Sequence, residues 1–383
     1  MQLFTGIFAV LLLAFPSLVL SESDISCYTP TGDEGICISA KQCPFVIDLL
    51  EQYNDKVPRI IRNQIRELAC DGEEGVRFAI CCPNTSKVIL EEHVEPQSLS
   101  FIDPKGMKIL DSVTPCGQRI PGAESLIVGS YGELTRIGEF PWMVLLKYET
   151  SGRPFLCGGS LITDRFVLTA AHCTTAPAKL IGVRLGEHNL DTDNDCSILL
   201  GNTREKKCLL PYEEFDIEDI RPHPKFERHT NSYDIALIKL NQSITFKPHI
   251  RPICLPIDKE SKDIAFDQSF YIAGWGTTEN GVASHILLKA VVERQHLDVC
   301  RKYYNNATFT ENHICAVNDR KQETCRGDSG GPLFFLNHFK KTISFVQYGV
   351  ISFGGQSCGI YENQPGVFAS VLDMLPWITQ NLY

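Results

Sequence analysis

Residues 327–333 read Gly-Asp-Ser-Gly-Gly-Pro-Leu, and this stretch carries the most specific chemical signal in the 383-residue chain. A serine hydroxyl becomes a nucleophile when a neighbouring base removes its proton. Glycine permits a tight turn in which the backbone N–H groups of Gly327 and Ser329 point to one spot. Two such N–H groups can stabilise the oxyanion that forms during acyl transfer. The stretch therefore predicts a nucleophile, Ser329, with an oxyanion hole made by Gly327 and Ser329.

Two motifs earlier in the chain supply the other groups that this chemistry needs. Thr169-Ala170-Ala171-His172-Cys173 follows an apolar run, and its small alanines leave room around the imidazole of His172. Asp234 stands directly before the apolar residues 235–238, where its carboxylate can accept a hydrogen bond from the imidazole. A single His or Asp beside a strand is most often structural. His172, Asp234 and Ser329 together, in that order, predict a catalytic triad.

The remainder of the C-terminal two thirds alternates short apolar runs with polar loops. Runs rich in branched or aromatic residues occupy 142–148, 165–170, 234–240 and 270–276. Many short strands of this kind are typical of sandwiches or barrels. The final run, 371–381, predicts a C-terminal helix, although Pro376 leaves its start open.

These motifs resemble the chymotrypsin-like serine proteases from Cys116 to Tyr383. The resemblance implies an all-β fold of two six-stranded antiparallel barrels and a C-terminal helix, with the triad in the cleft between the barrels. It implies that Ser329 attacks, that His172 acts as general base and then acid, and that Asp234 orients the imidazole. By the same resemblance, Ser352 flanks Asp234 and the substrate backbone.

The N-terminal segment and the net charge of the chain indicate its cellular compartment and the partners that it is expected to have. Ile7 to Leu20 is almost entirely apolar but short for a membrane span, and it is followed by Ser21. We expect a cleaved signal peptide over 1–21, with an uncleaved anchor as the alternative, and no later membrane segment. A net charge of -10 disfavours nucleic acid as a partner. We therefore predict a secreted protein of an extracellular, haemolymph-like fluid. The potential glycosylation sites are Asn84, Asn241 and Asn306.

Six of the sixteen cysteines lie between Cys27 and Cys82, and none follows until Cys116. In a secreted chain the cysteines are expected to form disulfides. The chain contains no Cys-x-x-Cys motif, which would have indicated a metal site. The first stretch is too small to be held by burial alone, and residues 43–70 have a helical pattern. We expect a signal peptide over 1–21, a stapled module over 22–82, a solvated and partly disordered linker over 83–126, and a main domain over 127–383.

The stapled module resembles the clip domain of arthropod proteases, which ends in the same adjacent pair, Cys81-Cys82. The two resemblances together imply a pairing that uses every cysteine. The pairs are Cys27–Cys81, Cys37–Cys70, Cys43–Cys82, Cys116–Cys254, Cys157–Cys173, Cys196–Cys208, Cys300–Cys315 and Cys325–Cys358.

Zymogens of this family are activated when a new N-terminal ammonium pairs with the Asp beside the nucleophile, here Asp328. The candidate terminus is Ile127, which would be released by a cut after Leu126. Leu126 is not basic, and the segment that follows is about two residues longer than the family pattern. Arg119-Ile120 is the basic alternative, but Pro121 would then lack an N–H that the inserted terminus donates. We favour the cut between Leu126 and Ile127.

By resemblance, the base of the substrate pocket is Glu323, where trypsin-like members usually carry Asp. Gly354 and Gly366 stand where that family keeps the pocket open. A carboxylate at the base of an open slot predicts cleavage after Arg or Lys. Glutamate is one methylene longer than aspartate and makes the slot shallower, so the preference between Arg and Lys can change. The alternative is that Glu323 points away from the pocket.

Residues 187–195 form a loop rich in oxygen donors. Hard oxygen ligands suit Ca²⁺. By resemblance to clip proteases, carboxylates would come from Glu187 and Asp195 and backbone carbonyls from Asn189 and Thr192. The alternative is an exposed acidic loop without a metal.

The leading functional prediction is an active endopeptidase of an extracellular cascade, which the resemblance links to Toll activation, melanisation and clotting in arthropods. Its expected partners are an upstream activating protease, a downstream zymogen or other protein substrate, and a serpin inhibitor. Two alternatives remain: a non-catalytic clip-domain scaffold, and a protein that acts chiefly by binding through its clip domain. The complete triad favours the enzyme.

Overall fold

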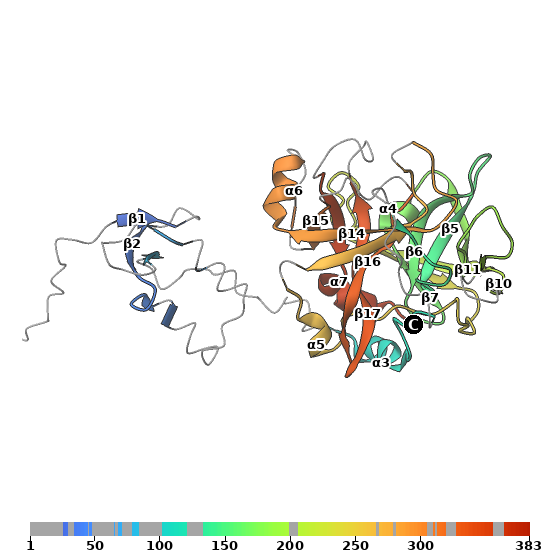
Figure 1. Ribbon diagram of the computed structural model, residues 1–383, viewed down its shortest axis with the longest axis horizontal. Coiled ribbons are helices and arrows are strands. Elements are labelled where there is room, and N and C mark those ends of the chain that lie inside the picture. Colours follow the sequence, from blue (N-terminus) through green and yellow to red (C-terminus); the bar gives the residue numbers. More distant parts are fainter. Residues whose placement is uncertain are drawn as a thin grey trace, which may run out of the picture. The chain divides into compact units, whose positions relative to one another are not determined.

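The computed structural model describes most of the chain beyond the first hundred residues and parts of the N-terminal region (Figure 1). The described residues are 26–29, 34–44, 46–47, 65, 68–70, 79–83, 102–120, 133–198, 206–265, 268–278, 281–304, 309–310, 312–318, 327–354 and 364–383. The chain divides into two compact units, Met1–Glu92 and His93–Tyr383. No helix among the described residues is long and apolar enough to cross a membrane.

The N-terminal unit contains a three-stranded antiparallel sheet in the order β1-β2-β3. The strands are β1 (Ser26–Tyr28), β2 (Glu34–Ser39) and β3 (Ala79–Pro83). Three disulfides hold this sheet around a small core, which includes Val46, Leu68 and the fully buried Ile80. The helical pattern predicted over 43–70 falls largely on residues 48–64, which lie outside the described part of the chain.

The first barrel of the C-terminal unit is closed by six antiparallel strands in the order β11-β12-β7-β6-β5-β8. Its strands are β5 (Met143–Glu149), β6 (Phe155–Leu161), β7 (Phe166–Thr169), β8 (Lys179–Leu185), β11 (Glu213–Pro222) and β12 (Ala236–Leu240). Every residue of β7 is buried, as expected of a strand in a closed barrel. A separate two-stranded ribbon is formed by β9 (Cys196–Ile198) and β10 (Lys206–Cys208).

The second barrel follows the order β13-β16-β17-β18-β15-β14, and pairing of β14 with β13 closes it. A short strand, β4 (Glu133–Leu134), adds to the edge of β14. The six barrel strands are β13 (Ser269–Gly274), β14 (Leu288–Gln295), β15 (His313–Val317), β16 (Pro332–Phe339), β17 (Thr342–Phe353) and β18 (Gly366–Ser370). The predicted fold class of two six-stranded antiparallel barrels is confirmed.

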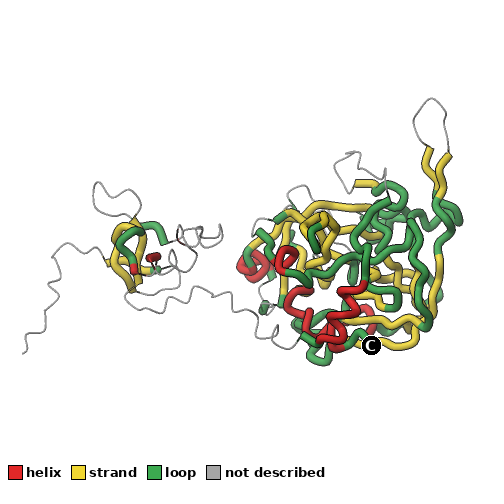
Figure 2. The backbone as a smooth tube through the Cα atoms, turned by 90° about the horizontal axis from the view of Figure 1, so that it is seen from below, coloured by secondary structure: helices red, strands yellow, loops and turns green. Residues whose placement is uncertain are grey.

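The helices in the described part of the C-terminal unit are short, and more of its residues lie in strands than in helices (Figure 2). They are α3 (Pro104–Ser112), α4 (Ala171–Thr174), α5 (Lys259–Lys262), α6 (Leu297–Tyr303) and α7 (Val371–Gln380). The predicted C-terminal helix is α7, which begins at the N-cap Ser370 and contains Pro376. Proline removes one N–H donor from the helix, but Leu375 and Ile378 are fully buried and keep α7 on the barrel.

Helix α3 is the main departure from the sequence-based expectation. Residues 83–126 were predicted to be a solvated, partly disordered linker, but 104–112 form a helix that packs on α7. Asp103 caps this helix by accepting the N–H groups of Lys105 and Gly106 at 2.8 and 2.9 Å. Pro104 occupies the first turn, where its missing N–H costs nothing. A single cluster of buried side chains contains Leu110 of α3 and the cores of both barrels.

Candidate active site

Two paired strands of the first barrel place His172 and Asp234 side by side. His172 lies in α4, directly after β7, and Asp234 lies just before β12, which pairs with β7. The Asp234 carboxylate accepts Nδ1–H of His172 at 2.7 Å through Oδ2 and the backbone N–H of His172 at 2.9 Å through Oδ1. Because the carboxylate is fully buried, it needs such donors to keep its charge. The two contacts fix both the position and the tautomer of the imidazole.

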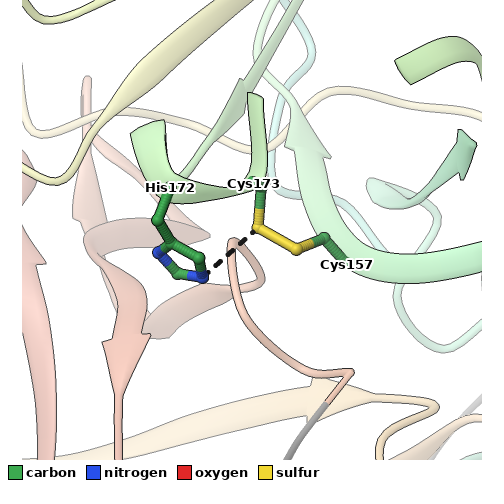
Figure 3. Close-up of side chains that lie close together, drawn as sticks. All are labelled: Cys157, His172 and Cys173. Carbon is green, nitrogen blue, oxygen red and sulfur yellow. Dashed lines mark hydrogen bonds between the residues drawn. A yellow bond between two sulfur atoms is a disulfide. The ribbon is translucent and has the colours of Figure 1, made fainter. Parts of the chain in front are cut away.

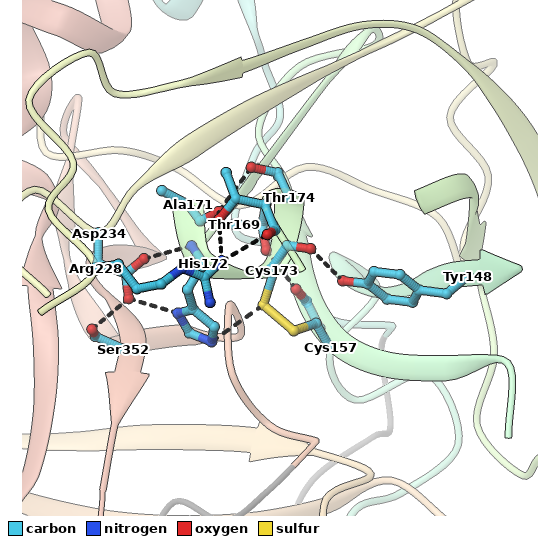
Figure 4. Close-up of a disulfide and its surroundings, with 12 residues drawn as sticks. Tyr148, Cys157, Thr169, Ala171, His172, Cys173, Thr174, Arg228, Asp234 and Ser352 are labelled. Atoms are coloured by element: carbon cyan, nitrogen blue, oxygen red, sulfur yellow. Dashed lines mark hydrogen bonds and ion pairs between the residues drawn. A yellow bond between two sulfur atoms is a disulfide. The ribbon is translucent and has the colours of Figure 1, made fainter. Parts of the chain in front are cut away.

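The second barrel supplies a third donor to the same carboxylate (Figure 4). Ser352 of β17 is 3% exposed, and its hydroxyl donates to Oδ2 of Asp234 at 2.5 Å. The segment before Asp234 is bent tightly, because Asn231 and Tyr233 both have positive φ, 52° and 55°. Asparagine tolerates a positive φ, but a bulky residue such as Tyr233 rarely adopts one unless its surroundings impose it. Stacking of Tyr233 on His223, with ring centroids 4.7 Å apart, contributes to that constraint.

The turn that carries Ser329 is packed tightly against the first barrel. Gly327 and Gly330 have positive φ, 102° and 82°. A Cβ on Gly330 would lie only 2.2 Å from Oγ1 of Thr169 and 2.4 Å from the carbonyl oxygen of Gly158. The N–H of Gly158 in turn donates to the Ser329 carbonyl at 2.8 Å. These contacts hold the partly exposed Ser329 beside the strands that lead to His172.

The other nitrogen of His172 faces a disulfide (Figure 3). Nε2 lies 3.6 Å from Sγ of Cys173, which is bonded to Cys157. In the described part of the chain, these residues are the one group of three His, Cys, Asp or Glu side chains close enough together to hold a metal ion, but both sulfurs are in the disulfide and cannot serve as thiolate ligands. Among the described residues, no hydrogen bond joins the Ser329 hydroxyl to His172. Catalytic hydrogen bonds of this kind commonly tighten only when substrate binds.

The carboxylate of Asp328 packs against Gly274 and Gly276. Its Oδ1 accepts the N–H of Gly276 at 2.8 Å. Side chains at Gly274 or Gly276 would collide with this carboxylate, at 2.0 and 2.4 Å. Arg153 comes from the loop between β5 and β6 and donates to the carbonyl of Trp275 at 2.9 Å. Burial lowers the pKa of Arg153, and the nearby charge of Asp328 opposes that effect.

The remaining predicted site residues fall into two groups. Gly366 is buried at the start of β18, and Gly354 is half-buried just after β17, on neighbouring strands of the second barrel. Asn241 is exposed after β12 and therefore accessible to modification. The predicted sites outside the described residues are Leu126, Ile127, Glu323, Asn84 and Asn306.

The structure joins seven of the eight expected cysteine pairs. They are Cys27–Cys81, Cys37–Cys70, Cys43–Cys82, Cys116–Cys254, Cys157–Cys173, Cys196–Cys208 and Cys300–Cys315. Cys325 and Cys358 lie outside the described residues. The bridge from Cys116 to Cys254 ties the segment before the candidate cut to the barrels.

The carboxylates predicted to bind Ca²⁺ do converge. Glu187 and Asp195 are buried and accept the same backbone N–H, that of His188, at 2.9 and 3.0 Å. Burial raises the pKa of Glu187, and the neighbouring Asp195 adds to this, whereas an ion pair with Arg184 at 3.0 Å opposes it. Two crowded, buried carboxylates with one cationic partner fit a hard divalent cation. The carbonyl of Asn189 accepts from Thr192 at 3.0 Å and closes the loop.

Sequence reasoning missed a buried ion pair between the second barrel and the segment before β5. Lys289 of β14 and Glu139 lie 2.7 Å apart, with side chains only 2% and 1% exposed. Arg119 adds a second cation 3.6 Å from the same carboxylate. Glu139 and Lys289 are 150 residues apart, so no local pattern could have indicated their pairing.

A buried Asp–His pair between two antiparallel barrels, with a serine in a glycine turn beside it, defines a serine protease of the trypsin-like class. Comparisons with known proteins agree. The sequence profile of the family "Trypsin" matches residues 130–378, and that of the "Regulatory CLIP domain of proteinases" matches residues 27–82. The chain belongs to the clip-domain serine proteases of the trypsin family.

Similar proteins span nearly the whole chain. The serine protease grass of Drosophila melanogaster is 35% identical over 366 residues, covering 93% of this chain and 90% of that protein. Melanization protease 1 of the same species is 32% identical over 380 residues, covering 93% and 92%. A crystal structure of the Drosophila Grass clip serine protease of the Toll pathway aligns with a TM-score of 0.63 at 33% identity, covering 94% of this chain and 97% of that one.

Proposed function

We propose that this chain is the secreted zymogen of a trypsin-like serine endopeptidase that cleaves after basic residues in an extracellular proteolytic cascade. The observation that carries the proposal is the buried Asp234 carboxylate, which accepts two hydrogen bonds from His172 and one from Ser352. A histidine held in this way has one nitrogen fixed and the other, Nε2, left to accept a proton.

In the proposed reaction, the Ser329 hydroxyl attacks the scissile carbonyl and its proton passes to Nε2 of His172. The C–N bond then breaks, the leaving amine takes that proton, and an acyl-enzyme remains on Ser329. Water hydrolyses the acyl-enzyme by the same proton route in reverse. Asp234 stabilises the imidazolium that forms in each half. The N–H groups of Gly327 and Ser329 would bind the oxyanion.

Activation is proposed to require a cut between Leu126 and Ile127, whose new ammonium would pair with Asp328. The position of Asp328 supports this role, because Gly274 and Gly276 leave room beside its half-buried carboxylate, where a new ammonium could form an ion pair with it. The alternative cut after Arg119 is disfavoured, because its guanidinium lies 3.6 Å from Glu139 and 4.8 Å above the Phe345 ring. N-terminal sequencing of the activated catalytic chain should read Ile-Val-Gly, and Ile-Pro-Gly would overturn the assignment.

Specificity for Arg and Lys is proposed to come from Glu323, at the base of a pocket that Gly354 and Gly366 leave open. A panel of peptide substrates that differ only in the residue before the cut tests this. Cleavage after Arg or Lys is expected, and replacing Glu323 by Gln should remove most of it. Cleavage only after aromatic residues would refute the proposal.

Calcium binding is proposed at Glu187 and Asp195, with the backbone of Asn189 and Thr192. When bound, the ion would neutralise the two crowded carboxylates and hold the loop. Calorimetric titration with Ca²⁺ should give heat for the wild type and for Asp193→Ala, which removes an exposed carboxylate of the same loop. Glu187→Ala should give none. Equal heats for Glu187→Ala and the wild type would dismiss the site.

The names of the relatives, one from the Toll pathway and one for melanisation, support a place in an innate immune cascade. The proposed partners are an upstream activating protease, a downstream zymogen or other protein substrate, and a serpin. Expression in insect cells should release the chain into the medium with residues 1–21 removed. Retention in the cell membrane would favour the uncleaved anchor instead.

A further inference from the structure

We infer that the protease unit carries a built-in docking surface for residues 102–120, so that the N-terminal chain stays bound after the activating cut without help from a disulfide. This rests on the proposed function only in that the cut falls after residue 120. A disulfide, Cys116–Cys254, also links the two sides. The structure shows contacts along the whole segment that do not depend on that bond.

The contact between α3 and α7 is close enough to require glycine. A Cβ on Gly106 would lie 1.8 Å from the carbonyl oxygen of Thr379. One turn earlier, the N–H of Asp103 donates to Oγ1 of Thr379 at 3.1 Å. Lys105 places its ammonium 3.8 Å from the centre of the Tyr383 ring. The helix therefore fits the backbone of α7 and the end of the chain with complementary shape and charge.

Apolar burial makes the docked helix part of the core. Leu110 is 4% exposed and belongs to the cluster that fills both barrels. Met107 and Ile109 are partly buried against the same cluster. Because one buried leucine and two partly buried apolar side chains favour the docked state over exposure to water, this face would be costly to separate. On the outer side, Lys340 pairs with Asp111 at 2.6 Å.

The segment after α3 continues the contact along β17. Gly117 donates its N–H to the Pro252 carbonyl at 2.8 Å and accepts the Phe345 N–H at 3.0 Å. The Gln118 amide donates to the Ser344 hydroxyl at 2.9 Å. These hydrogen bonds do not involve the peptide bond between Leu126 and Ile127, so the proposed cut would not break them directly. The described contacts of this segment extend to residue 120, and the proposed cut after Leu126 lies beyond them in the sequence.

The test uses the full chain with residues 121–126 replaced by the recognition sequence of a site-specific protease, so that the cut does not depend on natural activation. The disulfide is removed by Cys116→Ala with Cys254→Ala. After cleavage, gel filtration and mass spectrometry report whether the two chains elute together. The variant Gly106→Leu places a side chain against α7, and Lys108→Leu places the same side chain on the exposed face of α3 as a matched control.

The parent protein is the cleavable chain without the Cys116–Cys254 disulfide, and both other variants are made in it. After cleavage we expect the parent and Lys108→Leu to remain two-chain complexes. We expect Gly106→Leu to release its N-terminal chain or bind it at least ~10-fold more weakly. Release from the parent at once would overturn the inference and leave the disulfide as the only tether. Retention by Gly106→Leu equal to the parent would also contradict it. If the uncleaved Gly106→Leu variant does not fold, Leu110→Ala takes its place in the same assay, which measures release of the N-terminal chain after cleavage. Failure of the proposed protease activity would leave all these readings unchanged.

Discussion

Replacing Ser352 by Ala removes one of the three hydrogen bonds that hold the charge of Asp234. The lost contact is a 2.5 Å bond to a fully buried carboxylate. Hydrogen bonds to charged groups contribute roughly 1.5–3 kcal/mol. Since each factor of ten in rate corresponds to about 1.4 kcal/mol, the full loss would reduce kcat/KM roughly 10- to 150-fold. Part of the bond stabilises the resting enzyme equally, so the lower half of that range is expected.

The assay is steady-state cleavage of an Arg peptide by the activated two-chain enzyme, with active sites counted first. Ser344→Ala is the matched control, because Ser344 is 2% exposed on the same strand but bonds to Gln118 at 2.9 Å, away from Asp234. We expect Ser344→Ala to keep kcat/KM while losing comparable stability. An unchanged kcat/KM in Ser352→Ala, or an equal fall in both variants, would refute the reasoning.

Three further predictions concern groups around the barrels. Burial lowers the pKa of His223 to about 4, from an ordinary 6.5, so the unfolded chain binds the extra proton first. The contribution of neutral His223 to the free energy of unfolding should therefore be fully present above pH 6.5, and about 3 kcal/mol of it should be lost as the pH drops towards 4. Urea unfolding at several pH values measures this, and His223→Gln should reduce the dependence on pH. Lys289→Met leaves the buried charge of Glu139 with a weaker partner and should lower the free energy of unfolding in urea by about 3 kcal/mol. Adding Glu139→Gln to this variant should restore part of the lost stability, and a double mutant whose loss is the sum of the two single losses would argue against a coupled pair. Gly330→Ala forces a Cβ to within 2.2 Å of a neighbouring side chain at φ 82°. We expect it to lower kcat/KM at least ~100-fold by displacing the nucleophile, and near-normal activity would contradict the packing described.

The placement of His172, Asp234 and Ser329 could be predicted from the sequence because their signals are local. Each of the three residues stands beside a short apolar strand or within a glycine turn, and the pleated strands then carry them to one place. Strand positions were correct to within two residues for the runs at 142–148 and 165–170. The run at 234–240 begins as strand only at Ala236, because Tyr233 has a positive φ and the Ile235 carbonyl accepts the His223 N–H.

Helix α3 shows a signal that was present but outweighed. Asp103-Pro104, an N-cap residue followed by proline, is a helix start, and the apolar Leu110 lies about two turns later. The absence of cysteine and the scattered prolines favoured a linker instead. Only the tertiary contact with α7 makes so short a helix stable. The Lys289–Glu139 pair had no sequence signal at all, because its members come from segments far apart in the chain.

The most direct test of the central claim is active-site titration of the cleaved two-chain form with a serine-directed acylating reagent. The account predicts a burst of about one equivalent per catalytic chain, a mass adduct on Ser329, and no burst in Ser329→Ala. Absence of a burst from wild-type protein whose catalytic chain begins Ile-Val-Gly would contradict it and favour a scaffold or binding role.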